Sequence, residues 1–312
     1  MQPSPILHYL PVNENGQFRK ICLSEYGPPN PQETILCLPG LLETSAGWVD
    51  FVNYFAKKHT VYVIDFAGRA LSTYLPDRQE YRMSSCLADV CSAVAFINGG
   101  HQTIQRRKSA TDWIHPHPGL HVVGNSMGGL LAITIAAAEP DVVSSVVIND
   151  VGAIIPWAGL VAIMGSIYTA SVRSGEMSTS YSLTAIANDL DTDPRLLRAV
   201  MRPSYADLDL KQNLIGMSYE KYFSKVLAPT LLVYSESSRL VTPKVVEATQ
   251  LSKSIQICEI PGDDHPVRYN NELNQKIEAF ILQSPNRGAE FRDEPEQLIS
   301  TWFNRLRGKK SL

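Results

Sequence analysis

Apolar runs of strand length alternate with segments of helical spacing along most of this chain. The strand-like runs are residues 17–26, 34–38, 61–65, 120–123, 143–150, 229–234 and 254–260. Apolar residues recur at helical spacing in 45–58, 82–97, 130–138, 243–251 and 271–282. Such alternation favours an α/β fold with a mostly parallel central sheet and helices on both of its faces. We expect residues 17–26 to form an edge strand of that sheet.

The alternation stops between residues 152 and 224. Helical spacing there covers 157–172, 178–190 and 194–201. Parallel sheets bind their ligands beyond the carboxyl ends of the strands. We therefore predict that residues 1–151 and 225–312 form the core, and that residues 152–224 form a small helical cap over that edge.

Two other segments stand apart from the alternation. Residues 98–118 are polar and include a basic run at 106–108, and we interpret them as an enlarged surface loop with solvated charges. Towards the C-terminal end, apolar residues at helical spacing predict one more helix, which packs on the core. They are Leu298, Ile299, Trp302, Phe303 and Leu306.

One stretch combines structural and chemical signals. The apolar run 120–123 leads directly into Gly-Asn-Ser-Met-Gly, residues 124–128, and a helical run follows. A serine held in a tight turn between a strand and a helix is the arrangement of a nucleophile elbow. The glycines at 124 and 128 have no Cβ, so the two backbones can approach closely. Ser126 is therefore our candidate nucleophile.

The composition narrows the class of protein further. The chain has 312 residues, a formal net charge of −3 and five cysteines without metal-ligand spacing. This length fits one large domain or one domain with an insertion. The charge gives no reason to expect nucleic acid or a membrane as a partner, and we expect no metal and no cofactor. Reduced, mostly buried cysteines and the absence of a signal-peptide pattern at the N-terminus favour the cytoplasm.

Several motifs together resemble the α/β-hydrolase superfamily, in its capped, serine esterase-like branch. They are Leu38-Pro39-Gly40-Leu41, the Asp65-x-x-Gly68-Arg69-x-x-Ser72 loop, the Ser126 elbow, Asn149-Asp150-Val151-Gly152 and the late His265. The resemblance spans roughly residues 20–285. It implies that Ser126 is the nucleophile, that His265 is the base, and that the backbone N–H groups of Leu41 and Met127 form an oxyanion hole. The His-Gly that usually precedes the first donor is Pro39-Gly40 here, which leaves the amide in place.

The residues themselves also favour His265 as the base. A serine hydroxyl needs a neighbouring base to take its proton, and neutral imidazole suits that task near pH 7. His265 is the one histidine that follows the last predicted strand. His121 lies inside the elbow strand, and the remaining five lie outside the motif loops.

The family combines its serine and histidine with an acid in a catalytic triad, and the sequence leaves the identity of that acid open. The family usually carries its acid after the strand that ends at Tyr234, but Ser238 and Arg239 occupy the matching positions. Asp150, at the end of the preceding strand, is the favoured replacement. Glu236 is an alternative. Asp263, Asp264 or the absence of any acid is a weaker one. Asp65 is expected to have a structural role at its strand–loop turn.

Three functions fit these residues. The first is a carboxylic-ester hydrolase that acts on a small-molecule substrate with a small or medium apolar acyl group. Candidates to line its acyl pocket are Trp157, Met164, Tyr168, Met201 and Tyr205, although packing within the cap explains each of them as well. The second is a C–C bond hydrolase with the same triad. The third is a non-catalytic binding protein, which the missing acid after Tyr234 would fit.

Overall fold

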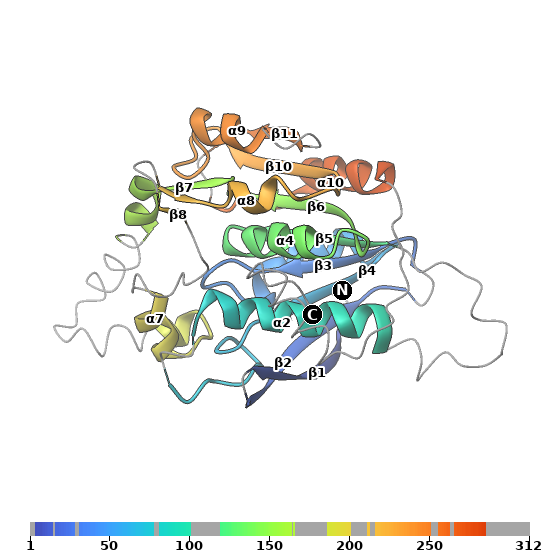
Figure 1. Ribbon diagram of the computed structural model, residues 1–312. Helices are drawn as coiled ribbons and strands as arrows, with labels where there is room; N and C mark the ends of the chain where they lie inside the picture. The colour runs from blue at the N-terminus through green and yellow to red at the C-terminus, as the bar shows by residue number, and fades with distance from the viewer. Residues whose placement is uncertain are drawn as a thin grey trace, which may run out of the picture.

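An eight-stranded sheet forms the centre of the molecule (Figure 1). The computed structural model describes residues 4–14, 16–28, 31–77, 81–100, 119–163, 165, 186–200, 211–212, 216–250, 255–262 and 265–284. The strand order is β1-β2-β4-β3-β5-β6-β10-β11. These strands are β1 (Ile6–Glu14), β2 (Gln17–Tyr26), β3 (Thr34–Leu38), β4 (Thr60–Asp65), β5 (Leu120–Asn125), β6 (Val143–Asn149), β10 (Thr230–Ser235) and β11 (Ile255–Ile260).

The sheet is mostly parallel, as predicted. Only the β1–β2 and β2–β4 pairs are antiparallel, and the other five neighbouring pairs are parallel. The carboxyl ends of β3, β4, β5, β6, β10 and β11 therefore meet along one edge, and the loops that carry the predicted chemistry leave the sheet there.

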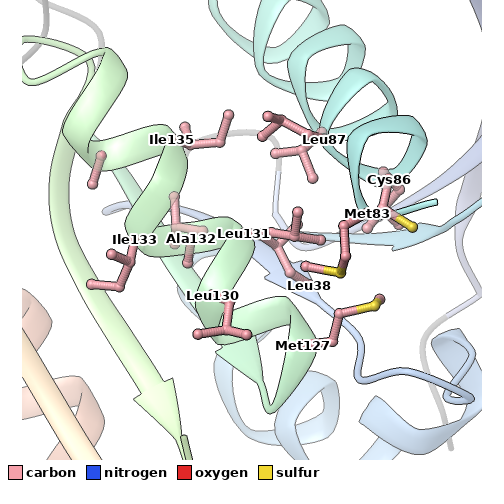
Figure 2. Close-up of a cluster of buried hydrophobic side chains, with 14 of the residues drawn as sticks. Leu38, Met83, Cys86, Leu87, Met127, Leu130, Leu131, Ala132, Ile133 and Ile135 are labelled. Carbon is pink, nitrogen blue, oxygen red and sulfur yellow. The ribbon is translucent and has the colours of Figure 1, made fainter. Parts of the chain in front are cut away.

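Helices cover both faces because alternate strand residues point to opposite sides. On one face, Ile35 and Cys37 pack with α1 (Val49–Phe55) and α10 (Asn271–Gln283). On the other face, Leu36 and Leu38 pack with α2 (Met83–Ala95) and α4 (Met127–Ala138). Figure 2 shows side chains of α2 and α4 meeting over Leu38. Other helical segments are η1 (Ser45–Trp48), η3 (Phe96–Gly100), α7 (Pro194–Val200), α8 (Glu220–Phe223) and α9 (Pro243–Gln250).

The prediction that residues 17–26 form an edge strand was wrong in one respect. They form β2, but β1 pairs outside them and is the edge. Leu10 and Val12 of β1 are buried, whereas Pro11 between them is exposed. A proline inside an apolar run weakens a strand prediction, yet edge strands tolerate it.

The segment 152–224 contains more than the predicted helices. Residues 157–163 and 186–189 are helical, and α7 follows. A three-stranded antiparallel sheet, in the order β7-β9-β8, was not predicted, because its strands have two or three residues each. They are β7 (Ile154–Pro156), β8 (Lys211–Gln212) and β9 (Gly216–Ser218). The remaining parts of the predicted helices, most of the loop 98–118 and the C-terminal apolar stretch lie outside the described residues.

Candidate active site

Ser126 occupies a tight turn between β5 and α4. Its φ of 48° and ψ of −113° are unusual for a residue with a side chain. The turn depends on close backbone packing, because a Cβ on Gly128 would lie 2.0 Å from the Leu38 carbonyl oxygen. The Ser126 N–H donates to the Asn149 carbonyl oxygen at 2.8 Å, which ties the turn to the neighbouring strand β6.

Three side chains from distant parts of the chain form a hydrogen-bonded row. The Nε2 atom of His265 lies 3.1 Å from the Ser126 Oγ. The Nδ1 atom of the same ring lies 2.6 Å from an Asp150 carboxylate oxygen. An ionised carboxylate can only accept, so Nδ1 carries the ring proton and the Nε2 lone pair faces the hydroxyl. This tautomer is the one that can take a proton from the serine.

Among the sequence-predicted acids that the structure describes, Asp150 is the one that contacts His265. It directly follows β6, adopts a φ of 56°, and donates its N–H to the Val233 carbonyl oxygen at 2.8 Å. Glu236 is exposed, and within the described residues no hydrogen bond joins its side chain to His265. Ser238 instead accepts two backbone N–H bonds in its own loop, and Asp263 and Asp264 lie outside the described residues.

The other histidines that the structure describes have different partners. His121 contacts Ser145 at 2.7 Å inside the sheet, and His59 contacts Glu278 at 3.3 Å. Burial lowers the pKa of the His59 imidazole. His8 contacts Glu25 at 2.7 Å.

Hydrogen bonds with Glu43 and Arg69 hold the turn that follows β3. The Glu43 carboxylate accepts the Gly40 N–H at 2.7 Å, and the Glu43 N–H donates to the Gly40 carbonyl oxygen at 3.3 Å. Arg69 donates to the Leu41 carbonyl oxygen at 2.6 Å. Because a trans peptide places its N–H opposite its carbonyl, the Leu41 N–H points away from Glu43. We call residues 39–43 the oxyanion turn, after the role that the sequence predicts for Leu41.

Met127 is the first residue of α4, directly after the serine. The first N–H groups of a helix have no preceding carbonyl within the helix to donate to. Its side chain is buried against α2 and β3, as Figure 2 shows beside Met83 and Leu38. The side chain therefore packs in the core, and the predicted role concerns the backbone alone.

Asp65 makes the structural contacts that the sequence predicts. Its carboxylate accepts the Ser45 N–H at 2.7 Å and the Ser45 hydroxyl at 3.0 Å. These bonds fasten the start of η1 to the end of β4. Burial raises the pKa of Asp65 to about 6, although the Ser45 bonds and the charge of Arg69 oppose the shift.

Four side chains to which the sequence assigned no role support the hydrogen-bonded row, those of Glu43, Asn125, Asn149 and Tyr269. Asn149 makes two hydrogen bonds to the backbone of Val267. The amide of Asn125 joins Tyr269 to Glu43. The available signal was a polar residue at the end of each of two apolar strands, immediately before Ser126 and Asp150.

Of the residues expected to line an acyl pocket, the structure describes Trp157. Its side chain is partly buried and packs against the core. Met164, Tyr168, Met201 and Tyr205 lie outside the described residues. In the part of the chain that the structure describes, no three His, Cys, Asp or Glu residues gather closely enough to hold a metal ion. No helix there is long and apolar enough to cross a membrane.

Comparison with known proteins identifies similar chains. The chain is 24% identical over 152 residues to a 3-hydroxybutyrate-oligomer hydrolase of Cupriavidus necator, a match that covers 49% of this chain and 46% of that relative. It therefore aligns with less than half the length of that enzyme. A 2-(acetamidomethylene)succinate hydrolase of Mesorhizobium japonicum is 23% identical over 258 residues, which cover 78% of this chain and 84% of that relative.

A solved structure supports the fold, and a family model supports the family. An alpha/beta hydrolase structure from Novosphingobium aromaticivorans superposes with a TM-score of 0.65 at 19% identity, covering 90% of this chain and 99% of that chain. At this identity the likeness concerns the fold alone. The model of the alpha/beta hydrolase family matches residues 35–273, a range that includes Ser126, Asp150 and His265. This chain belongs to the alpha/beta hydrolase family.

Proposed function

We propose that this protein is a serine hydrolase that cleaves a carboxylic ester with a small or medium apolar acyl group through an acyl-enzyme. The observation that carries the proposal is the hydrogen-bonded row from the Ser126 hydroxyl through His265 to Asp150, with distances of 3.1 and 2.6 Å. Ser126 is the proposed nucleophile, His265 the base and Asp150 the acid that orients the ring.

In the proposed reaction, the Ser126 Oγ attacks the ester carbonyl carbon while its proton passes to the Nε2 atom of His265. The imidazolium ion that forms lies against the Asp150 carboxylate, which stabilises its charge. As the tetrahedral intermediate collapses, Nε2 returns the proton to the leaving alcohol. Water then attacks the acyl-enzyme by the same steps and releases the acid and free Ser126.

The negative charge on the carbonyl oxygen needs hydrogen-bond donors. We assign this role to the N–H groups of Leu41 and Met127, each of which would contribute about 3 kcal/mol to the transition state. The bond from the Glu43 N–H to the Gly40 carbonyl oxygen supports this assignment for Leu41, because it fixes the orientation of the peptide that carries the Leu41 N–H.

An apolar acyl group is supported by the side chains near the elbow. Leu41 and Leu42 are partly buried next to the core, and we propose that residues 152–224 form the cap over this edge. Two contacts support that placement. The Ala70 N–H donates to the Asp191 carbonyl oxygen at 2.7 Å, and a Cβ on Gly159 would lie 2.5 Å from the Leu240 side chain.

The location of the protein is also a proposal. All five cysteines are free thiols, and four of them are buried. Thiols of this kind persist in reducing compartments, which supports the cytoplasm.

The direct test is hydrolysis of p-nitrophenyl acetate and butyrate by the purified protein. Turnover that is lost in Ser126→Ala, together with labelling of wild-type Ser126 by a fluorophosphonate, would support the proposal. The substrate panel should include 3-hydroxybutyrate oligomers and 2-(acetamidomethylene)succinate, after which the two relatives are named. A diketone in the same panel tests for C–C bond cleavage. If no ester is hydrolysed and Ser126 does not react, the proposal is wrong.

A further inference from the structure

Two buried asparagines end the neighbouring strands β5 and β6. Asn125 and Asn149 are register partners in the parallel pairing of these strands, with exposures of 3% and 0%. Each directly precedes a member of the hydrogen-bonded row, Ser126 or Asp150. Both of these following residues have a positive φ, so the chain turns sharply after each asparagine.

The amide of Asn149 holds the backbone that carries His265. Its Nδ2 donates to the Val267 carbonyl oxygen at 2.8 Å, and its Oδ1 accepts the Val267 N–H at 3.0 Å. An amide supplies both a donor and an acceptor, so it satisfies both polar groups of one buried residue. Val267 lies two residues after His265.

The amide of Asn125 holds a second point on the same segment. Its Oδ1 accepts the Tyr269 hydroxyl at 2.6 Å, and its Nδ2 donates to the Glu43 carboxylate at 3.1 Å. Burial raises the pKa of the Tyr269 phenol well above its usual value, so the phenol keeps its proton and donates. The Tyr269 ring packs against Trp48 and Phe51.

The position of His265 depends on such bonds. Ser126 and Asp150 sit at strand ends, and the sheet fixes their separation. His265 lies between β11 and α10, residues 265–270 form neither helix nor strand, and 30% of the His265 side chain is exposed.

We propose that Asn125 and Asn149 are positioning residues that fasten residues 265–269 to the sheet, so that the His265 ring lies between Ser126 and Asp150. Asn125 also bonds to Glu43, so it links residues 265–269 to the oxyanion turn as well as to the sheet. The inference rests on the proposed function for its kinetic readout and on the geometry for its spectroscopic readout.

The kinetic test uses Asn149→Ala and Tyr269→Phe of the full chain, with Thr249→Val as the matched control. Thr249 is also buried, and its hydroxyl accepts the Ala153 N–H and donates to the Val245 carbonyl oxygen. Misplacement of a catalytic group by about 1 Å lowers rates about 100-fold, so we expect this loss of kcat in Asn149→Ala and about 10-fold in Tyr269→Phe. KM for p-nitrophenyl acetate should change less than about three-fold, and Thr249→Val should keep kcat within that range.

The spectroscopic test does not need turnover. The proton on His265 Nδ1, held by Asp150, should give a downfield ¹H resonance that disappears in Asp150→Asn. We expect it to be lost or broadened in Asn149→Ala and retained in Thr249→Val. Thermal melts of all variants separate this effect from loss of the fold. If Asn149→Ala does not fold, Tyr269→Phe decides by the same two readouts.

The outcomes distinguish the two proposals. The positioning role is wrong if Asn149→Ala loses no more kcat than Thr249→Val at a similar melting temperature, or if its downfield resonance is unchanged. If the wild type hydrolyses no ester, but its resonance is present and is lost in Asn149→Ala, the positioning role stands and the ester hydrolase proposal fails.

Discussion

At the scale of single residues, His265 and its partner Asp150 have opposite surroundings. The Asp150 side chain is 1% exposed, whereas that of His265 is 30% exposed. The carboxylate is therefore shielded from competing water, and its bond to Nδ1 fixes the tautomer of a ring that solvent can reach.

Replacement of Asp150 by asparagine should remove most of the activity without unfolding the protein. An amide can donate to Nδ1 and so favours the tautomer whose Nε2 carries the proton, which cannot accept one from Ser126. We expect kcat for p-nitrophenyl acetate to fall about 10⁴-fold. Glu236→Gln, in the adjacent loop, is the control and should stay within about two-fold of the wild type. The opposite ranking of the two variants would exclude Asp150 as the orienting acid.

Asp65 should make stability depend on pH. Burial raises its pKa from 3.8 to about 6 in the folded protein, so between these values the folded state holds a proton that the unfolded state has released. The contribution of this carboxyl to stability is complete below pH 3.8 and is lost as the pH rises through about 6. In Asp65→Asn, the free energy of unfolding relative to the wild type should therefore increase by about 3 kcal/mol from acidic to neutral pH. Denaturant melts at several pH values measure this change, and parallel curves for the two proteins would contradict it.

The residues of the candidate site differ in how far sequence could predict them. Ser126 lies in a local pattern of strand, glycine turn and helix, so a short stretch is enough to identify it. The choice between Asp150 and Glu236 depends on which loop reaches the ring, and that follows from the positive φ at Asp150 and its bond to Val233. Asn149 and Tyr269 act through contacts between distant segments, which one sequence does not reveal.

At the scale of elements, the turn around Ser126 can form only because α4 and β3 approach each other closely at Gly128. A Cβ on Gly128 would lie 2.0 Å from the Leu38 carbonyl oxygen and 2.7 Å from that of Pro39. Both neighbours are backbone atoms that belong to the sheet edge and the oxyanion turn. The helix therefore cannot shift without moving the proposed active site.

Gly128→Ala should consequently destabilise the protein by about 3 kcal/mol or more. Gly47→Ala in η1 is the control, because nothing lies within 4 Å of its added Cβ, and its melting temperature should match that of the wild type. Differential scanning fluorimetry of both variants makes the comparison. Equal melting temperatures would show that the elbow tolerates a side chain at this position.

The elements could be predicted where periodicity was strong and continuous. β3, β4 and β5 are short apolar runs buried at every position, and they were identified from that pattern. β1 was missed because Pro11 interrupts a pattern in which only Leu10 and Val12 are buried apolar residues. The strands of the small sheet are too short for any period to be visible.

At the scale of the whole molecule, a buried ion pair joins the antiparallel end of the sheet to a helix. Arg19 of β2 donates to Asp89 of α2 at 2.8 Å, and the two side chains are 2% and 0% exposed. Arg19 also contacts Glu14 of β1 and the carbonyl oxygen of Ser85. One side chain thus links three elements.

Arg19→Ala should destabilise the protein by about 3–5 kcal/mol, because it leaves the Asp89 charge buried and unpaired. Arg19→Met combined with Asp89→Leu should recover part of this loss, although the Ala67 N–H then loses its acceptor. Lys276→Ala, which removes an exposed ion pair with Glu272, should leave the melting temperature unchanged. Thermal melts rank the three variants, and an Arg19→Ala value equal to that of Lys276→Ala would be the contrary result.

The parallel pairing of β5 with β6 separates the proposed machinery into a rigid and an adjustable part. Ser126 and Asp150 directly follow Asn125 and Asn149, which pair with each other across the two strands. The distance between Ser126 and Asp150 is therefore set by the sheet and does not depend on loop length. Of the three side chains in the row, only the His265 imidazole comes from a connection between two elements, β11 and α10. Insertions or deletions in that connection would therefore change the reactivity of the serine while leaving the architecture intact, which makes this short linker the natural place to engineer or to silence the enzyme.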